Sequence, residues 1–269
     1  MTLIDRGEGV AVIVVPGIQG RWEWHRPGID AMAALCRVLT FSFADEPGSK
    51  ARFDSLACLD SYCDQIRDVM TQAGLSSAAL CGISYGGLVA AVFAARHPER
   101  VSSLILVSAL PPTWKPDARI GVFLRSPRLC TPLFLLGSVR LFAEILTASP
   151  GITAAIATAL RHAYNALTHM FSPIRMARRA SQLSGLNLTT EMSNVRASTL
   201  LIVGEPGLDR VVPTAATLDY LHLLRDARAV TLERTGHLGS ITRPETFAAL
   251  VASFAQTCVA STDPRRRLG

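Results

Sequence analysis

The chain has 269 residues, of which 49% are hydrophobic and 18% are charged. This composition is typical of a globular protein and excludes intrinsic disorder. No uncharged apolar run reaches about 18 residues, so no membrane span is expected. The net charge of +6 is uneven, because residues 112–187 hold nine basic and two acidic side chains. No binding motif accompanies this basic block, so a nucleic-acid partner is not expected.

The six cysteines form no CxxC pair. A chain of this length buries a large core without disulfides, and no long apolar segment resembling a secretory signal opens it. We therefore expect reduced thiols and a cytoplasmic location.

Short apolar runs rich in β-branched residues alternate with amphipathic segments. The pattern predicts strands at 10–15, 37–44, 78–83, 101–108, 199–203 and 229–232. It predicts helices at 28–35, 54–73, 85–96, 213–224 and 244–254. Such alternation indicates an α/β fold with a mainly parallel sheet of about six strands and helices on both faces.

The alternation stops between residues 112 and 194, where helical periodicity continues without strand signals. The basic block lies in the same interval, so two independent signals indicate an inserted helical segment. The predicted division is a core of residues 1–111 and 195–269 with residues 112–194 inserted. We expect helices in the apolar stretch 129–159 to bury one face over the active site. Most arginines of the inserted segment should lie on the opposite face, in contact with solvent. One or two arginines are expected instead at the mouth of the substrate pocket, and the clustered Arg175, Arg178 and Arg179 are the candidates.

A candidate nucleophile lies between a predicted strand and a predicted helix. Gly82-Ile83-Ser84-Tyr85-Gly86 matches the G-x-S-x-G pattern. In this context the serine lies on a tight strand-to-helix turn, and the flanking glycines allow close packing. The hydroxyl then projects at a helix N-terminus, which favours developing negative charge.

A serine nucleophile needs a general base. Among six histidines, His237 directly follows the last predicted strand, at the sheet edge where such folds place their sites. The acid that orients the base should be Asp209, in the loop after the preceding strand, with Glu205 as the alternative. The order Ser84, Asp209, His237 is the order expected of a known fold.

An oxyanion hole requires two backbone N–H donors. Tyr85 should supply one, and Ile18, in the turn after the first strand, should supply the other. Trp22, Trp24 and Trp114 are tentative pocket residues, with core packing an equally good interpretation. The site calls for no metal and no cofactor.

These motifs together resemble the α/β-hydrolase superfamily in its serine-nucleophile, esterase-like branch. The resemblance implies that residues 112–194 form a helical lid. Two departures stand out. Pro16 replaces a histidine of the usual oxyanion turn, so a hydrogen-bonding partner of that loop should be lost. The short segment before the first strand suggests that the N-terminal antiparallel hairpin is absent.

The resemblance implies hydrolysis of a carboxylic ester with a small or medium apolar acyl group through an acyl-enzyme. Carbon–carbon bond hydrolysis, acyl transfer and haloperoxidase-like activity use the same triad and remain alternatives. A non-catalytic, receptor-like binding module is a third class. The expected partner is a small-molecule substrate, and the sequence leaves the substrate and the oligomeric state open.

Overall fold

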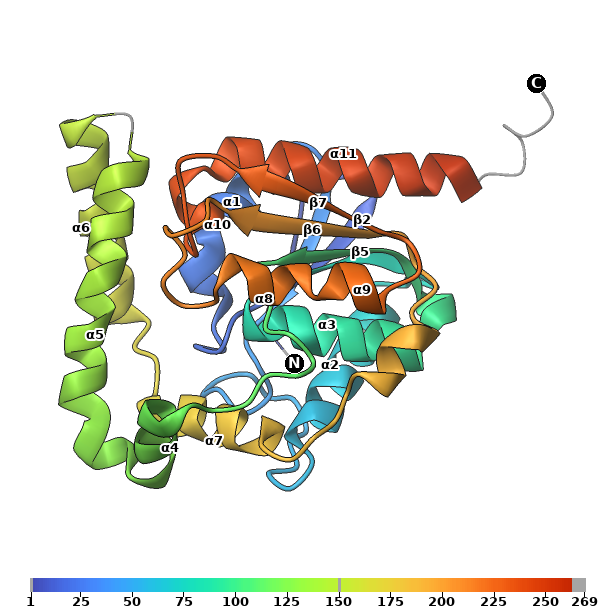
Figure 1. Cartoon of the computed structure of the whole chain (residues 1–269). Helices are drawn as coiled ribbons and strands as arrows, with labels where there is room; N and C mark the ends of the chain where they lie inside the picture. Colours follow the sequence, from blue (N-terminus) through green and yellow to red (C-terminus); the bar gives the residue numbers. More distant parts are fainter. Residues whose placement is uncertain (1, 150, 263–269) are drawn as a thin grey trace.

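The computed structural model describes residues 2–149 and 151–262. For residues 133–140, 142, 143, 166 and 262 it describes the backbone only. Its centre is a seven-stranded sheet in the order β1-β3-β2-β4-β5-β6-β7 (Figure 1). The strands are β1 (Leu3–Arg6), β2 (Ala11–Val15), β3 (Arg37–Phe41), β4 (Ala78–Ile83), β5 (Val101–Val107), β6 (Thr199–Gly204) and β7 (Ala227–Leu232). All pairings are parallel except that of β1 with β3. The predicted α/β class is confirmed.

The sheet has one strand more than the expected six. β1 pairs antiparallel with β3, with Leu3 opposite Phe41. Its sequence, LIDR, has no buried apolar run, and its last two residues are exposed. An edge strand bonded along one side needs no such run, which is why the apolar pattern did not reveal it.

Helices cover both faces of the sheet (Figure 1). One face carries α1 (Arg26–Met32) and α11 (Pro244–Thr262). The other carries α2 (Cys58–Gln72), α3 (Tyr85–Arg96), α8 (Thr214–Leu218) and α9 (Tyr220–Leu223). Alternate residues of β2 point into two apolar clusters, Ile13 and Val15 into one and Val12 and Val14 into the other. A strand that is buried on both faces therefore has apolar residues at consecutive positions of its sequence.

Between β5 and β6 the chain forms α4 (Ala118–Arg125), α5 (Pro127–Ala148), α6 (Ile152–Thr168), α7 (Pro173–Leu183) and the short η3 (Thr190–Asn194). The arrowheads of β6 and β7 point toward α5 in Figure 1, so α5 and α6 lie beyond the carboxyl ends of these strands. No helix in the described part of the chain is long and apolar enough to cross a bilayer. All six cysteines are free.

Two of the three arginines of α7 are paired with acids of the segment that follows β3, and whether any of the three reaches a substrate stays a prediction. Arg179 is fully buried and forms ion pairs with Asp45 and Glu46. Arg175 donates two hydrogen bonds to Glu46, at 3.0 and 3.1 Å. The negative charges that follow β3 thus neutralise both side chains, and only Arg178 is exposed. The charge count of the inserted segment could not show these partners because they lie outside it.

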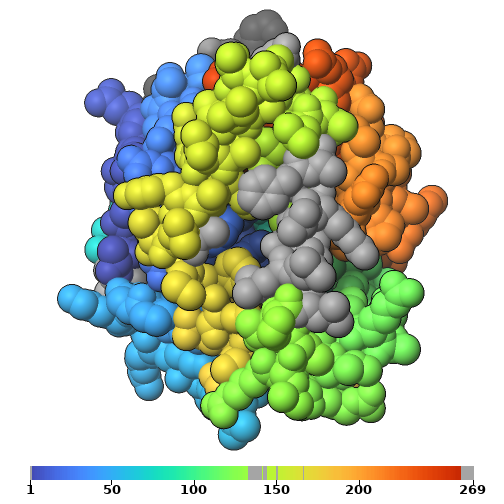
Figure 2. Space-filling model, turned by 90° about the vertical axis from the view of Figure 1, so that its left-hand side faces the viewer, coloured from blue at the N-terminus to red at the C-terminus, as the bar shows by residue number. Residues whose placement is uncertain are grey.

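The expectation that the apolar stretch 129–159 buries one face over the site stays a prediction, because the side chains of 133–140, 142 and 143 lie outside those described. α6 exposes large apolar residues at helical spacing, whereas its buried position Ala155 is small. The exposed set comprises Ile152, Ile156, Leu160, Tyr164 and Leu167. Figure 2 shows a hollow in the face of the molecule that includes α6, beside the yellow atoms of the end of α6 and the start of α7 and with blue atoms of the N-terminal part of the chain at its floor.

Candidate active site

Ser84 lies at the turn between β4 and α3, where its backbone is strained. Its φ of 55° and ψ of −119° are outside the regions that L-residues normally adopt. Three backbone hydrogen bonds hold the turn: Ser84 N–H donates to Val107, and Gly87 and Leu110 donate to the Ser84 carbonyl. The side chain is nearly buried, with 6% of the residue exposed. The tight strand-to-helix turn expected from the pentapeptide is therefore present, and the role of Ser84 as a nucleophile remains a prediction.

The two glycines of this turn are required by close contacts. A Cβ on Gly82 would lie 2.4 Å from the Gly86 carbonyl oxygen, and a Cβ on Gly86 would lie 2.2 Å from the Pro16 oxygen. The second contact presses the start of α3 against the turn that follows β2. The predicted nucleophile and the predicted oxyanion turn are therefore neighbours.

The structure brings His237 and Asp209 together. His237 Nδ1 lies 3.1 Å from Asp209 Oδ2, and both side chains are largely buried, at 10% and 1% exposed. Glycines bring the two loops into contact, since a Cβ on Gly236 would lie 2.4 Å from the Leu208 oxygen. Glu205, the alternative acid, instead accepts a hydrogen bond from the Arg234 N–H at 2.6 Å.

Asp209 is held as a carboxylate. Burial by itself would raise its pKa, but the hydrogen bond and charge of His237 and the N–H groups of Val211 and Val212 outweigh burial and lower it. An ionised acid at Nδ1 leaves Nε2 of His237 as the nitrogen that can accept a proton.

The oxyanion turn has a partner that sequence reasoning missed. We expected Pro16 to leave this turn without a hydrogen-bonding histidine, but Gly17 N–H donates to His25 Nε2 at 3.3 Å. His25 belongs to η1 (Trp22–His25), and its Nδ1 lies 3.2 Å from the Ser240 hydroxyl. The missing histidine is thus replaced in space by one further along the chain, and the expected loss is wrong.

The electrostatics of His25 suit that role. Burial, with a smaller contribution from His237, lowers its pKa to about 3. A neutral imidazole can accept the Gly17 hydrogen bond, whereas an imidazolium has no acceptor nitrogen. The sequence shows that His25 lies a few residues after the turn that follows β2. It does not show that the imidazole ring points back toward Gly17.

Ile18 lies in the turn after β2, and Tyr85 directly follows Ser84. Arg179 Nη1 donates to the Ile18 carbonyl at 2.6 Å, which fixes the orientation of that residue. Tyr85 begins α3, directly after Ser84, and its ring is buried against Phe43 and Tyr62. Their backbone N–H groups remain the proposed donors.

The three tryptophans lie in different surroundings. Trp24 is 6% exposed, packs edge-on against His162 and Phe171, and donates to the His169 carbonyl at 3.2 Å. Trp22 packs on the apolar cluster beneath α1 and α11, with the Arg6 guanidinium 5.7 Å from its ring centre. Trp114 packs against the opposite cluster. These contacts account for all three as packing residues, and a substrate role for each remains a prediction.

A second missed residue, Glu144 of α5, contacts the His237 loop. Its Oε1 accepts hydrogen bonds from the N–H groups of Gly236 and Leu238, at 2.8 and 2.6 Å. The only signal in the sequence was an isolated acid in an apolar helix.

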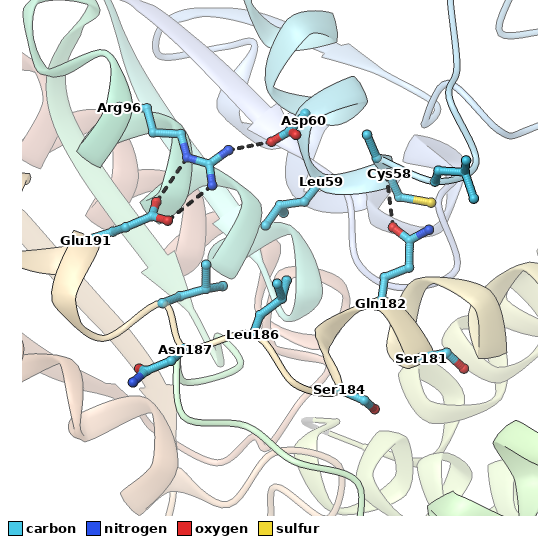
Figure 3. A pocket seen from close by; sticks show the side chains of 13 residues that line it. Cys58, Leu59, Asp60, Arg96, Ser181, Gln182, Ser184, Leu186, Asn187 and Glu191 are labelled. Atoms are coloured by element: carbon cyan, nitrogen blue, oxygen red, sulfur yellow. Dashed lines mark hydrogen bonds and ion pairs between the residues drawn. The ribbon is translucent and has the colours of Figure 1, made fainter.

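A surface cleft of about 380 Å³ lies elsewhere, between the start of α2, the end of α7 and η3. None of the predicted site residues lines it. Figure 3 shows Arg96 held between Asp60 and Glu191, while Gln182 accepts a hydrogen bond from the Cys58 N–H. Among the described residues that line the cleft, the one cation, Arg96, is therefore already paired with the two acids of the cleft.

Comparisons with known proteins agree with this architecture. The family model described as the alpha/beta hydrolase fold matches residues 10–129. Among sequence relatives, a protein designated a carbamate hydrolase, RutD, of Azorhizobium caulinodans is 25% identical over 253 residues, covering 92% of each chain. The 2-hydroxymuconate semialdehyde hydrolase of Pseudomonas putida is 25% identical over 268 residues, covering 94% of this chain and 89% of its own.

Among solved structures, an esterase from Exiguobacterium antarcticum superposes with a TM-score of 0.78 at 20% identity, covering 94% of both chains. The seven-stranded sheet, the strained serine turn after β4 and the family match lead to the same assignment. The chain has the α/β-hydrolase fold, and its residues 10–129 match the model of that family.

Proposed function

We propose that the protein is a serine hydrolase that cleaves a carboxylic ester of a small or medium apolar acyl group. The observation that carries this proposal is the pairing of His237 with Asp209 at the sheet edge where Ser84 lies on its strained turn. A serine nucleophile with a base and an acid that orients the base form the machinery of acyl transfer, and the approach of His237 Nε2 to the Ser84 hydroxyl is part of the proposal.

In the proposed reaction His237 Nε2 takes the proton of the Ser84 hydroxyl as the oxygen attacks the ester carbonyl carbon. The negative charge that develops on the carbonyl oxygen is stabilised by the N–H groups of Ile18 and Tyr85. When the tetrahedral intermediate collapses, the carbon–oxygen bond breaks and His237 returns its proton to the leaving alkoxide. Water, activated by the same histidine, then hydrolyses the acyl-enzyme and regenerates Ser84.

Each supporting residue contributes to one step. Asp209 stabilises the imidazolium that forms on His237 and keeps Nδ1 protonated. His25 and Arg179 hold the oxyanion turn through Gly17 and Ile18. The site itself supplies the nucleophile, the base and the oxyanion donors, so the proposed reaction needs no cofactor.

Turnover of p-nitrophenyl esters of increasing chain length, together with covalent labelling by a fluorophosphonate probe, tests the proposal. Ser84→Ala and His237→Ala should each lower kcat by roughly 10³-fold or more without unfolding the chain. Ser77→Ala is the matched control, because Ser77 is an exposed serine in the loop before β4. Ester turnover that survives in Ser84→Ala, or a probe adduct on another residue, contradicts the assignment.

A second candidate, carbon–carbon bond hydrolysis, is favoured by the similarity to 2-hydroxymuconate semialdehyde hydrolase. It would use the same triad on a vinylogous diketone. Assaying a chromogenic ring-cleavage product beside the ester series separates the two, because the larger kcat/KM identifies the bond that the site favours.

A further inference from the structure

Glu144 is a buried carboxylate that the proposed mechanism does not use. It lies on α5, in the inserted segment, and only 6% of the residue is exposed. Its Oε1 accepts hydrogen bonds from three groups: the Gly236 N–H at 2.8 Å, the Leu238 N–H at 2.6 Å and the Thr235 hydroxyl at 3.2 Å. One oxygen thus holds the residues on both sides of His237.

The contact constrains the part of the chain that carries the proposed base. The loop from β7 to α10 (Gly239–Thr242) includes Arg234, whose φ of 57° is left-handed, and Gly236, which has no side chain to anchor it. Two N–H groups held by one acceptor orient the 235–236 and 237–238 peptide planes, which lie on either side of His237. They thereby fix the direction in which the imidazole leaves the backbone.

Burying this acid is unfavourable in itself. Burial raises the pKa of Glu144, and the N–H donors of Leu238 and Gly236 and the charge of His237 oppose that effect. Its neighbour Ile145 packs in a small apolar cluster with Leu238 and Ile241. An apolar side chain at position 144 would extend that cluster without desolvating a charge, so packing alone does not account for the acid.

We infer that Glu144 is a positioning residue through which α5 holds His237 in place for Ser84. Ile145 and Glu144 join α5 to the same loop, the first by apolar contact and the second by three hydrogen bonds. The base is therefore correctly placed only while α5 stays docked at the carboxyl edge of the sheet. Displacement of α5 removes the three bonds and releases the loop, so the inserted helices form part of the active site. This inference rests on the proposed function.

Two variants separate hydrogen bonding from side-chain bulk. Glu144→Ala removes the acceptor, whereas Glu144→Gln keeps an oxygen that can accept the same N–H bonds. Leu146→Ala is the matched control, because Leu146 is the exposed residue two positions further along α5. The measurements are kcat and KM on the preferred ester, and amide hydrogen exchange at Gly236 and Leu238.

Glu144→Ala should lower kcat by about 10- to 100-fold, the loss expected when a catalytic group is misplaced by about an ångström. Glu144 is buried and bonded to the loop of His237, so a positioning role predicts an unchanged KM. Exchange at Gly236 and Leu238 should accelerate. Glu144→Gln should retain both the kcat and the slow exchange of the parent, and Leu146→Ala should match the parent in every measurement.

A folded Glu144→Ala variant with the parent's kcat, or a loss confined to KM, overturns the inference. If Glu144→Ala does not fold, Glu144→Gln decides: retained kcat supports the inference, and lost kcat in a folded Glu144→Gln overturns it. If the parent cleaves no ester, the proposed function has failed separately. Amide exchange then still tests the anchoring, because unchanged exchange in Glu144→Ala overturns it.

Discussion

His25 shows how one buried side chain links the stability of this protein to pH. It is 9% exposed, accepts a hydrogen bond from Gly17 and contacts Ser240, and its pKa is lowered to about 3. The unfolded chain binds a proton at this residue near pH 6.5. Between these two values the unfolded state therefore binds more protons, and stability must fall as the pH is lowered.

Lowering the pH from 7 to 5 should cost about 2 kcal/mol of unfolding free energy through His25 alone. In His25→Gln this part of the pH dependence should disappear, although the variant starts from a lower stability. Urea unfolding at the two pH values measures both. His222→Gln is the control, because His222 is exposed on α9, and it should keep the parent's pH dependence. A parent-like drop in His25→Gln would mean that His25 titrates normally in the folded state.

The tightest local packing among the elements lies where α3 meets the turn after β2. Gly86 begins that contact, and a Cβ there would lie 2.2 Å from the Pro16 oxygen and 2.4 Å from the Val15 oxygen. Both neighbours are backbone atoms, so neither can move without shifting the strand end. The same contact joins the turn of Ser84 to the turn of Ile18.

Gly86→Ala should therefore destabilise the protein by about 1–3 kcal/mol or more, as overpacking does. It should also lower kcat, because the nucleophile and the oxyanion donors move apart. Gly121→Ala, inside α4, is the matched control: its Cβ would meet nothing within 4 Å. It should stabilise the chain by about 0.5–1 kcal/mol through helix propensity. Thermal unfolding of the two variants gives the comparison, and equal stabilities would refute the close contact.

At the scale of the whole molecule, Arg179 joins segments far apart in the sequence. From α7 it forms ion pairs with Asp45 and Glu46, donates to the Ile18 carbonyl and contacts the Tyr62 hydroxyl at 3.3 Å. Its guanidinium also fills the space beside Gly20, where a Cβ would lie 2.4 Å from it. Helix α7 is thus bonded to the turn after β2, and helix α5 to the loop after β7.

Arg179→Met should destabilise the protein by about 3–5 kcal/mol, because it leaves the buried Asp45 carboxylate without a cation and removes one of the two arginines that bind Glu46. It should also reduce kcat, since the Ile18 carbonyl loses its donor. Arg178→Met changes the adjacent, exposed arginine and should have little effect on either quantity. Urea unfolding and ester turnover of both variants check this. An Arg179→Met protein as stable as the parent would show that the ion pairs contribute nothing net.

The elements of the core could be predicted because their signals are local. β4 and α3 have the predicted bounds, since a buried strand and the helix after it are each encoded by neighbouring residues. The contact of His237 with Asp209 also followed from the sequence, because loops after adjacent parallel strands meet at one edge. β1 was missed because a short edge strand carries no such apolar signal.

The amino-acid sequence by itself determined the fold class, the serine turn and the order of the proposed triad. Only the tertiary structure decided what holds them in place. His25 replaces a partner that we expected to be lost, Glu144 bonds to Gly236 across 92 positions, and Arg179 reaches Asp45 across 134. The physical reason is that a buried polar group must find its partner in space. The sequence identifies the polar side chain, but it does not show which distant backbone group or carboxylate will form its hydrogen bonds.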